Sequence, residues 1–446
     1  MRRTRLLFML AVGASLTGCA LSPTPEPYAP GNLRSQAAAR ELPPRVGAVP
    51  QPTSPPVTPR EGSSGRLTLR EALTLAERLH PELAASEAQV QAAEGRALQA
   101  GLFPNPELVA RTEAAPVTGS FTSQAEYIVG ISQPFPLGNR LSAARRVEAH
   151  DRDRLLHAWE GKRWDVRVRV QSAFATALYW QRVIQARTED VELAENGARV
   201  ANARLEAGDA IPAEVGQAEV ELGQARLARE RAVSMYEQAL EALATALGDP
   251  TFRVESLEGS LEEEFALPGL ESLVSRLEQH PAVAAAEADI TVQRARLELA
   301  RAQRTPDVNV EVSYRRLGEV ENAVDVGMRL PIPLFNRHQG SIREAEAETA
   351  AAEARARVLR HELTLDLQAS HRKLTSAMAS ATLLRKEILP RAERVLESAE
   401  ARYRSGDMSL AELLPIRRDW TRARLDHLEA LNEVMQAWAV LSPYVR

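Results

Sequence analysis

The chain has 446 residues, of which 44% are apolar, 26% charged and only 4% aromatic. A membrane-spanning helix needs about 20 consecutive apolar residues. The longest apolar run, residues 6–18, is shorter and lies near the N-terminus, so a bundle of spanning helices is excluded. A single cysteine excludes a disulfide scaffold, and a net charge of −5 with interspersed basic residues excludes the basic surface of a nucleic-acid-binding protein.

The first 18 residues have the layout of a secretory signal peptide. Three arginines precede an apolar segment, and small residues follow it up to Cys19. The sequence Leu16-Thr17-Gly18-Cys19 resembles a bacterial lipobox, in which the cysteine is acylated and becomes the first residue of the mature lipoprotein. We therefore expect residues 1–18 to be removed and Cys19 to carry lipid, and Ala20 favours sorting to the outer membrane. The alternative is a cysteine that is discarded with the signal peptide.

Residues 19–65 have the composition of an extended tether. Eleven of the 27 prolines lie between residues 20 and 60, and neither helical nor alternating periodicity is present there. At about 3.1 Å per residue, such a segment reaches tens of ångströms. It is long enough to separate a lipid anchor from a folded body.

The rest of the chain consists of two tandem repeats of one unit, residues 66–258 and 259–446. Prolines, glycines and turns recur in the same order, which chance similarity between two helices rich in alanine, glutamate and arginine does not produce. The distance along the sequence between matching residues of the two repeats is 200 residues at first, then 197 and finally 198. The matched segments are His80-Pro81 and His280-Pro281, 130–140 and 327–337 (six of eleven residues identical), and Gly208-Asp209 and Gly406-Asp407.

Each unit contains two predicted strands, at about residues 107–133 and 308–331. Apolar and polar residues alternate on both sides of Gly318, which is typical of a hairpin with one apolar and one charged face, and the first unit repeats the pattern more weakly. Six of the 20 aromatic residues lie in or beside the four strands, which suits a membrane interface. A soluble β-sandwich core would also place aromatic residues there.

A membrane location requires several copies of the chain. Backbone groups in lipid must all be paired, so only closed barrels survive there, and bacterial barrels have at least eight strands. With four strands per chain, the barrel must be shared. We predict that Val310, Val312, Val324 and Val326 face lipid, and that the opposite residues line the water-filled lumen, namely Glu311, Arg315, Asp325 and Arg329.

Long helical segments follow each pair of strands, at about residues 139–247 and 336–441. We expect Asn139 and Asn336 to cap the first helix of each pair. Residues 140–207 alone would form roughly 100 Å of helix, which indicates a rod or the wall of a large tube. Alanines at seven-residue spacing predict a close helix–helix seam after it. They are Ala218, Ala225, Ala232, Ala239 and Ala246, with Ala423, Ala430 and Ala437 in the second unit.

Over residues 66–441 the chain resembles the TolC-like outer-membrane efflux proteins. Segments 101–108 (GLFPNPEL) and 131–140 (ISQPFPLGNR) are similar to the branch that serves heavy-metal-cation exporters, the CzcC and CusC type. The resemblance implies a mainly α fold with a small β part: a homotrimer that forms a 12-stranded β-barrel, with four strands per chain, and a long α-helical tunnel. It also implies two partners, a periplasmic adaptor and an inner-membrane RND pump.

No catalytic or metal-binding motif competes with a passive role. The eight histidines form none of the spacings of zinc sites, the methionines are dispersed, and there is no glycine-rich phosphate loop. His80 and His280 each precede a proline, and we interpret them as turn residues at a helix break rather than as metal ligands. We expect no enzyme activity, no metal site and no cofactor.

Two turns, 205–212 and 403–410, each place Gly-Asp between long helices. A structural interpretation is that glycine ends one helix with positive φ and aspartate caps the next. By the resemblance, however, these turns are the periplasmic tips that narrow the tunnel and meet the adaptor, where six carboxylates per trimer would favour cations. The candidate tip residues are Arg204, Gly208, Asp209, Arg402, Gly406 and Asp407.

We therefore expect a lipid-anchored exit duct in the outer membrane of a Gram-negative bacterium, extending into the periplasm. As part of a tripartite RND-type system it would export heavy-metal cations, or alternatively drugs and other organic compounds. A periplasmic adaptor lipoprotein would need a lipoyl-like β module, rich in glycine and valine, between its helices, and no such segment is present. A soluble coiled-coil scaffold would leave the alternating strands unexplained.

Overall fold

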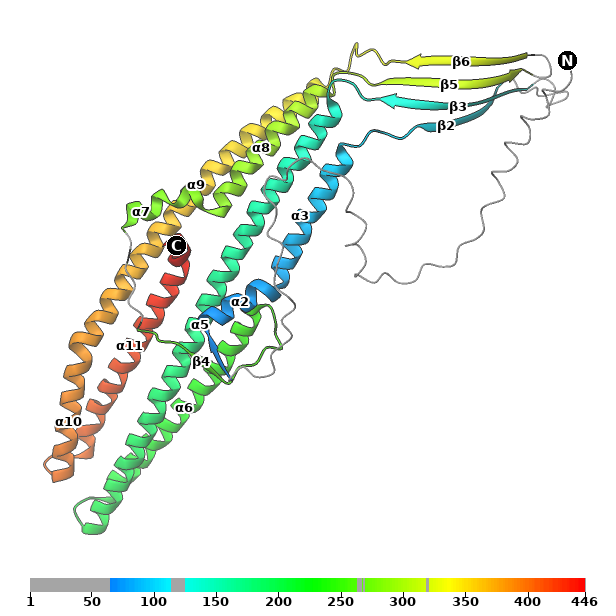
Figure 1. Cartoon of the computed structure of the whole chain (residues 1–446). Coiled ribbons are helices and arrows are strands. Elements are labelled where there is room, and N and C mark those ends of the chain that lie inside the picture. The colour runs from blue at the N-terminus through cyan, green and yellow to red at the C-terminus, as the bar shows by residue number, and fades with distance from the viewer. Residues whose placement is uncertain (1–64, 114–124, 263–266, 268, 318–320, 446) are drawn as a thin grey trace, which may run out of the picture. The chain divides into compact units, whose positions relative to one another are not determined.

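Helices and strands alternate in the same order twice along the chain (Figure 1). The computed structural model describes residues 65–113, 125–262, 267, 269–317 and 321–445. The predicted signal peptide, Cys19 and the tether lie outside these residues. The elements are β1 (Arg66–Thr68), α2 (Leu69–Leu79), α3 (Pro81–Ala100), β2 (Glu107–Glu113), β3 (Glu126–Phe135), α5 (Arg140–Ala207), α6 (Pro212–Leu247), β4 (Ser256–Glu258), α7 (Leu270–Ser275), η1 (Leu277–Gln279), α8 (Pro281–Ala302), β5 (Val308–Leu317), β6 (Glu321–Arg329), α9 (Gln339–Leu383), η2 (Leu384–Ile388), α10 (Leu389–Ser405) and α11 (Leu410–Val445).

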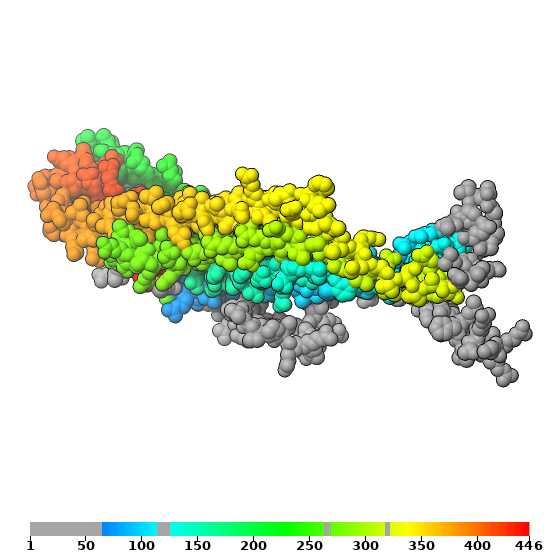
Figure 2. Space-filling model, turned by 90° about the horizontal axis from the view of Figure 1, so that it is seen from above, coloured from blue at the N-terminus to red at the C-terminus, as the bar shows by residue number. Residues whose placement is uncertain are grey.

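The long helices form the body of the described chain. Helix α5 packs against α3 and α6, and α9 packs against α8 and α11, so each repeat has one long helix with two shorter ones beside it. Figure 2 shows α8 and α9 side by side along one face. Helix α5 has 68 residues and is thus about 100 Å long, which separates the strands from the α5–α6 turn. Among the described helices, none combines the length and apolar character needed to cross a bilayer.

The four predicted strands form one antiparallel sheet in the order β2-β3-β5-β6. Each repeat supplies one hairpin, and pairing of β3 with β5 joins the two hairpins. The register aligns Leu108, Ile131, Val312 and Val326 across all four strands. Because successive side chains point to opposite faces of a sheet, this register places most of the large apolar residues on one face, with Val109 and Ile128 on the other.

Of the two predicted helix caps, Asn139 lies at the N-cap of α5, whereas Asn336 does not cap α9. Asn139 does precede α5, but it has left-handed geometry (φ 57°) and its side chain makes no capping hydrogen bond. In the second repeat this position is taken by His338 (φ 56°), two residues after Asn336. The Asn336 side chain instead accepts a hydrogen bond from the His338 N–H at 3.0 Å. A left-handed residue is needed because the chain turns sharply here to enter the helix, and asparagine tolerates that geometry better than most residues.

The alanine seam packs as predicted. Three of its five members on α6 are buried, as are all three on α11. Alanine lets helix backbones approach closely, so these stripes hold α6 and α11 in the bundle. The buried alanines are Ala218, Ala232, Ala239, Ala423, Ala430 and Ala437.

Pro390 does not end the second long helix. A π-helical turn, η2, precedes it, and the helix continues as α10. Proline lacks an N–H and clashes with the preceding turn of an α-helix, and a wider turn relieves this conflict.

A second, two-stranded sheet was not predicted. Leu67 lies in β1, which pairs in parallel with β4. Helix α2 begins at Leu69, where Thr68 and Glu71 form a capping box. Leu67 and Leu257 belong to the largest buried cluster, together with residues of α5 and α11. The small sheet therefore packs against the helices and contributes to the core of the helical body.

Candidate functional site: a two-faced sheet and the helical tips

One face of the four-stranded sheet is apolar and exposed. Its central row consists of Leu108, Ile131, Val312 and Val326, which are between 48% and 78% exposed. The next row, Val129, Tyr314 and Val324, is about half exposed or more. Contiguous apolar surface of this kind marks contact with lipid or another protein rather than with water.

The opposite face is charged. Arg315 lies 2.7 Å from the Asp325 carboxylate and 3.3 Å from that of Glu126, while Arg111 lies 3.6 Å from Glu311. The predicted lumen residues Glu311, Arg315, Asp325 and Arg329 all lie on this face by register. Arg315 and Asp325 pair with each other, whereas Glu311 belongs to a separate group around Arg111. Glu126 and Arg111 were not among the predicted lumen residues, although strand alternation places both on the same face.

Crowding differs between the two faces. On the charged face Ile128, Ser132 and Ser313 are at most 5% exposed, and a Cβ added to Gly130 would lie 2.4 Å from that of Ser313. Side chains of the apolar face are spread apart and exposed. This asymmetry is what a sheet curled toward its charged face produces.

The tips end in matching glycine turns. Gly208 (φ 81°) and Gly406 (φ 85°) follow α5 and α10. The N–H of Asp209 donates to the Arg204 carbonyl at 2.8 Å, and the equivalent bond in the second tip is 2.9 Å long. This is the Schellman arrangement, which only a residue tolerant of positive φ closes without strain.

Neither tip aspartate caps the following helix, contrary to the structural interpretation of the sequence. Helix α6 begins after Ile211 with no side-chain cap. At α11, the Ser409 N–H and hydroxyl donate to the carboxylate of Glu412, and these hydrogen bonds lower the pKa of Glu412. Asp209 and Asp407 are both exposed to solvent, and the Asp407 carboxylate accepts a hydrogen bond from the Ser405 hydroxyl at 2.8 Å.

A buried polar cluster joins the two tips within the chain. The Arg204 guanidinium lies 5.1 Å from the ring centroid of Tyr403, which is 3% exposed. Burial raises the pKa of Tyr403. Nearby, Arg417 donates to the Leu193 carbonyl at 3.2 Å and to Glu400 at 2.9 Å. The sequence pointed to Arg204 but gave no signal for Tyr403, whose role depends on which helices meet.

The paired histidines are turn residues, as interpreted. His80 accepts a hydrogen bond from the Glu82 N–H at 3.2 Å through Nδ1, and His280 accepts one from the Ala282 N–H at 3.1 Å. Burial lowers the pKa of both rings, which keeps Nδ1 available as an acceptor. In the described ranges, no group of three or more His, Cys, Asp or Glu residues is placed to hold a metal ion.

Comparison with known proteins decides the family. The model of the outer membrane efflux protein family matches residues 72–249 and 273–444. The chain belongs to the outer membrane efflux protein family. It is 30% identical over 385 residues to the cobalt-zinc-cadmium resistance protein CzcC of Cupriavidus metallidurans, which covers 86% of this chain and 90% of the relative. It is also 28% identical to the nickel-cobalt-cadmium resistance protein NccC of Alcaligenes xylosoxydans xylosoxydans, over 70% of this chain and 69% of that protein.

The fold of this efflux protein is also that of solved channels. The crystal structure of CusC superposes with a TM-score of 0.68 at 18% identity, over 83% of this chain and 91% of that one. The resemblance to TolC-like outer-membrane channels and the expected mainly α fold are therefore confirmed.

Proposed function

We propose that this efflux protein is the trimeric exit duct of a tripartite RND-type system and that it exports heavy-metal cations. The observation that carries the proposal is the two-faced sheet: an exposed apolar face backed by a charged face that is crowded and internally paired. A single four-stranded sheet leaves two edges with unpaired backbone groups, which lipid does not tolerate. Three copies supply twelve strands, enough for a bacterial barrel.

The apolar face then contacts lipid and the charged face lines the lumen. Among the described residues of the charged face, five are acidic and three are basic, namely Glu107, Glu113, Glu126, Glu311 and Asp325 against Arg111, Arg315 and Arg329. A water-filled pore with an acidic excess favours cations over anions. The names of the relatives CzcC and NccC point to divalent transition metals as the cargo.

The helical tips form the other end of the duct in this proposal. Exposed Asp209 and Asp407 from three copies would surround the axis as six carboxylates, at the end where a periplasmic adaptor and an inner-membrane pump are engaged. Arg204 and Arg402, which donate to the backbone carbonyls of these aspartates at 3.2 and 3.4 Å, hold the two turns in place. The protein itself performs no catalytic step, and ions move through it passively.

Lipidation of Cys19 completes the proposal, with residues 19–65 as the tether. Replacing Cys19 with serine should abolish incorporation of labelled palmitate while some protein still inserts, because the barrel rather than the acyl chain holds the duct in the membrane. Equal labelling of wild type and Cys19→Ser would rule the anchor out.

The function is tested by co-expression with the periplasmic adaptor and the inner-membrane pump of a heavy-metal RND system, in a host that lacks its own metal exporter. We expect raised tolerance to Zn²⁺, Co²⁺ or Cd²⁺, and loss of that tolerance in a Val312→Arg variant that fails to assemble. Raised tolerance to organic antibiotics without any change in metal tolerance would reassign the cargo. Absence of trimers from outer membranes would overturn the duct itself.

A further inference from the structure

A groove lies where the strands of the second repeat meet its long helices. It is bounded by the segment between β6 and α9, by the first two turns of α9 and by the residues that follow α8 (Figure 1). Its volume is about 670 Å³, and small-molecule sites have volumes of about 300–1,000 Å³. The groove is therefore large enough for a ligand or for part of one.

The rim of the groove continues the apolar face of the sheet. The alternation of β6 extends to Leu330 and Ile332, which are both exposed. The N–H of Leu334 then donates to the Ile332 carbonyl at 2.9 Å, and after this tight turn Leu334 is exposed and Phe335 is 91% exposed. Exposed aromatic and aliphatic side chains at the end of a lipid-facing strand are typical of a membrane interface. In the proposed duct, the groove therefore lies at the edge of the bilayer, beside the lipid headgroups.

The groove has an excess of positive charge. It is lined by Arg304, Arg337 and Arg343, which are exposed. None of the three guanidinium groups has an ion pair or a hydrogen bond in the part of the chain that the structure describes. Among the described lining residues, Glu346 is the only acidic one, and it pairs with Arg301 at 3.3 Å. These charges suit an anionic ligand.

Comparison of the repeats shows which arginines stay unpaired. At the offset of 197 residues, Arg343 corresponds to Arg146 of α5, which pairs with Glu298 of α8 at 3.0 Å. At the offset of 200 residues, Glu298 corresponds to Leu98, so the first repeat offers no equivalent carboxylate to Arg343. The position equivalent to Arg304 is a proline, so no ion pair is repeated there either.

Arg337 differs from the other two arginines. Its counterpart Arg140 pairs with Asp307, and the residue equivalent to Asp307 is the acidic Glu107. In the proposed trimer, Arg337 thus has a carboxylate available from the edge strand of a neighbouring copy. Only Arg304 and Arg343 are left to bind an anion.

We propose that Arg304 and Arg343 bind the phosphate of an anionic glycerophospholipid, whose acyl chains lie against Leu334 and Phe335. The inference rests on the duct proposed above, because it requires the sheet to lie in a membrane. Guanidinium groups match a phosphate through paired N–H donors, and the apolar rim removes the acyl chains from water. One bound lipid per copy would fix the depth of the duct in the bilayer at the junction of strands and helices.

Lipid binding is measured by native mass spectrometry on the purified full-length trimer. The trimer is held in mixed micelles that contain either phosphatidylglycerol, which is anionic, or phosphatidylethanolamine, which has no net charge. We expect up to three bound phosphatidylglycerol molecules per trimer and weaker binding of phosphatidylethanolamine. Each arginine near an anionic lipid strengthens binding roughly fivefold. Arg304→Gln with Arg343→Gln should therefore weaken phosphatidylglycerol binding roughly thirtyfold.

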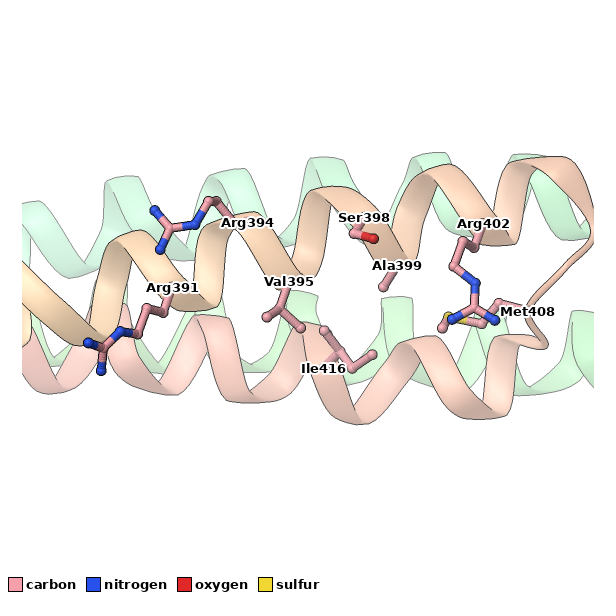
Figure 3. Close-up of a pocket in the computed structure, with 8 residues that line it drawn as sticks. All are labelled: Arg391, Arg394, Val395, Ser398, Ala399, Arg402, Met408 and Ile416. Carbon is pink, nitrogen blue, oxygen red and sulfur yellow. The ribbon is translucent and has the colours of Figure 1, made fainter.

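The matched control removes two arginines at the other end of α9. Arg391 and Arg394 line a second groove with Val395 and Ile416, here called the α10–α11 groove (Figure 3). Helix α9 has 45 residues, so about 70 Å of helix separates the two grooves. Arg391→Gln with Arg394→Gln changes the net charge of the chain by the same amount, and it should bind phosphatidylglycerol like the wild type. Equal loss of binding in this control would indicate a general charge effect and overturn the site.

A soluble phosphate ester is the other source of the same chemistry. The compound sn-glycerol 3-phosphate carries the phosphate without acyl chains, so it should not displace phosphatidylglycerol at equal concentration. Displacement at equal concentration would identify a soluble anion as the occupant and overturn the lipid.

Trimer content on native gels is recorded for every variant, which separates loss of lipid from loss of folding. Both arginines are exposed and unpaired among the described residues, so their replacement should leave the trimer intact. Equal phosphatidylglycerol binding by the wild type and by Arg304→Gln with Arg343→Gln would overturn this inference and leave the proposed duct standing. Absence of wild-type trimers from outer membranes would overturn the duct itself.

Discussion

A charge on the apolar face of the sheet should prevent assembly, whereas the same charge on the opposite face should not. Val312 lies in the middle of β5, between Ile131 and Val326, and all three side chains are exposed on the apolar face. Arginine near the middle of a bilayer costs about 2–4 kcal/mol on the lipid face of a barrel. Val312→Arg therefore costs roughly 6–12 kcal/mol for three copies, which lowers the assembly equilibrium by more than about a thousandfold.

Glu311→Arg is the matched control, one residue away on the charged face. It removes a 3.6 Å contact with Arg111, whose side chain is 44% exposed. Exposed ion pairs contribute about 0–1 kcal/mol, so the control should assemble at close to the wild-type level. Both variants introduce the same side chain into the same strand, so strand propensity and expression are matched.

The assay is the amount of heat-modifiable trimer in purified outer membranes, normalised to total protein by immunoblot. We expect Val312→Arg to be nearly absent from the trimer band and Glu311→Arg to be present. Equal yields would refute the reasoning, since they would mean that the two faces do not differ in their surroundings. Loss of both variants would instead indicate that the charged face is packed too tightly to accept a longer side chain.

Three further outcomes follow from the tips, the turns and the buried histidines. Replacing both Asp209 and Asp407 with asparagine should leave thermal stability unchanged, because backbone hydrogen bonds close the two turns. The double variant should show a weaker cation preference in planar bilayers, with the largest difference at low salt. Unchanged selectivity would exclude an electrostatic constriction. Gly406→Ala should lower the free energy of unfolding by ~1–2 kcal/mol, because alanine is strained at positive φ. Gly248→Ala should lower it by about 1–3 kcal/mol more, because the added Cβ would lie 2.8 Å from the backbone of the α2–α3 turn. Equal melting temperatures of the two variants would contradict this ranking. Burial lowers the pKa of His280, so the unfolded chain takes up the proton first and the stability of the fold should decrease as pH drops below about 6.5. This decrease should be shallower in the His280→Asn variant. If the variant has the same pH profile in melting experiments, His280 is not the cause.

Some of the fold was readable because local signals are strong and unbroken. Residues 140–207 contain no proline, and α5 spans that range in the structure. Alternation in β5 and β6 was equally clear, and the register places the predicted residues on two opposite faces. In both cases one periodicity persists long enough to outweigh exceptions.

Other features depend on contacts that periodicity does not encode. Strands β1 and β4 have three residues each, too few for an alternating pattern, and form only because the segment before α2 meets the segment after α6 beside α5. Pro390 reads as a helix end, yet the π turn carries the helix past it. The tip cluster around Tyr403 and the α10–α11 groove depend on which helices lie side by side. For the same reason the tip aspartates were assigned a capping role that Ile211 and Ser409 occupy instead.

The π turn before Pro390 also fixes the rotational phase of the second repeat. One extra residue turns every later side chain by about 100° around the helix axis. Leu396, Ala399 and Tyr403 face the buried cluster only with this offset in place. A deletion between residues 384 and 388 would swing all three outward and bring charged neighbours inward, although it removes no core residue. Side-chain direction at the second tip is therefore set by the length of the chain some ten residues earlier.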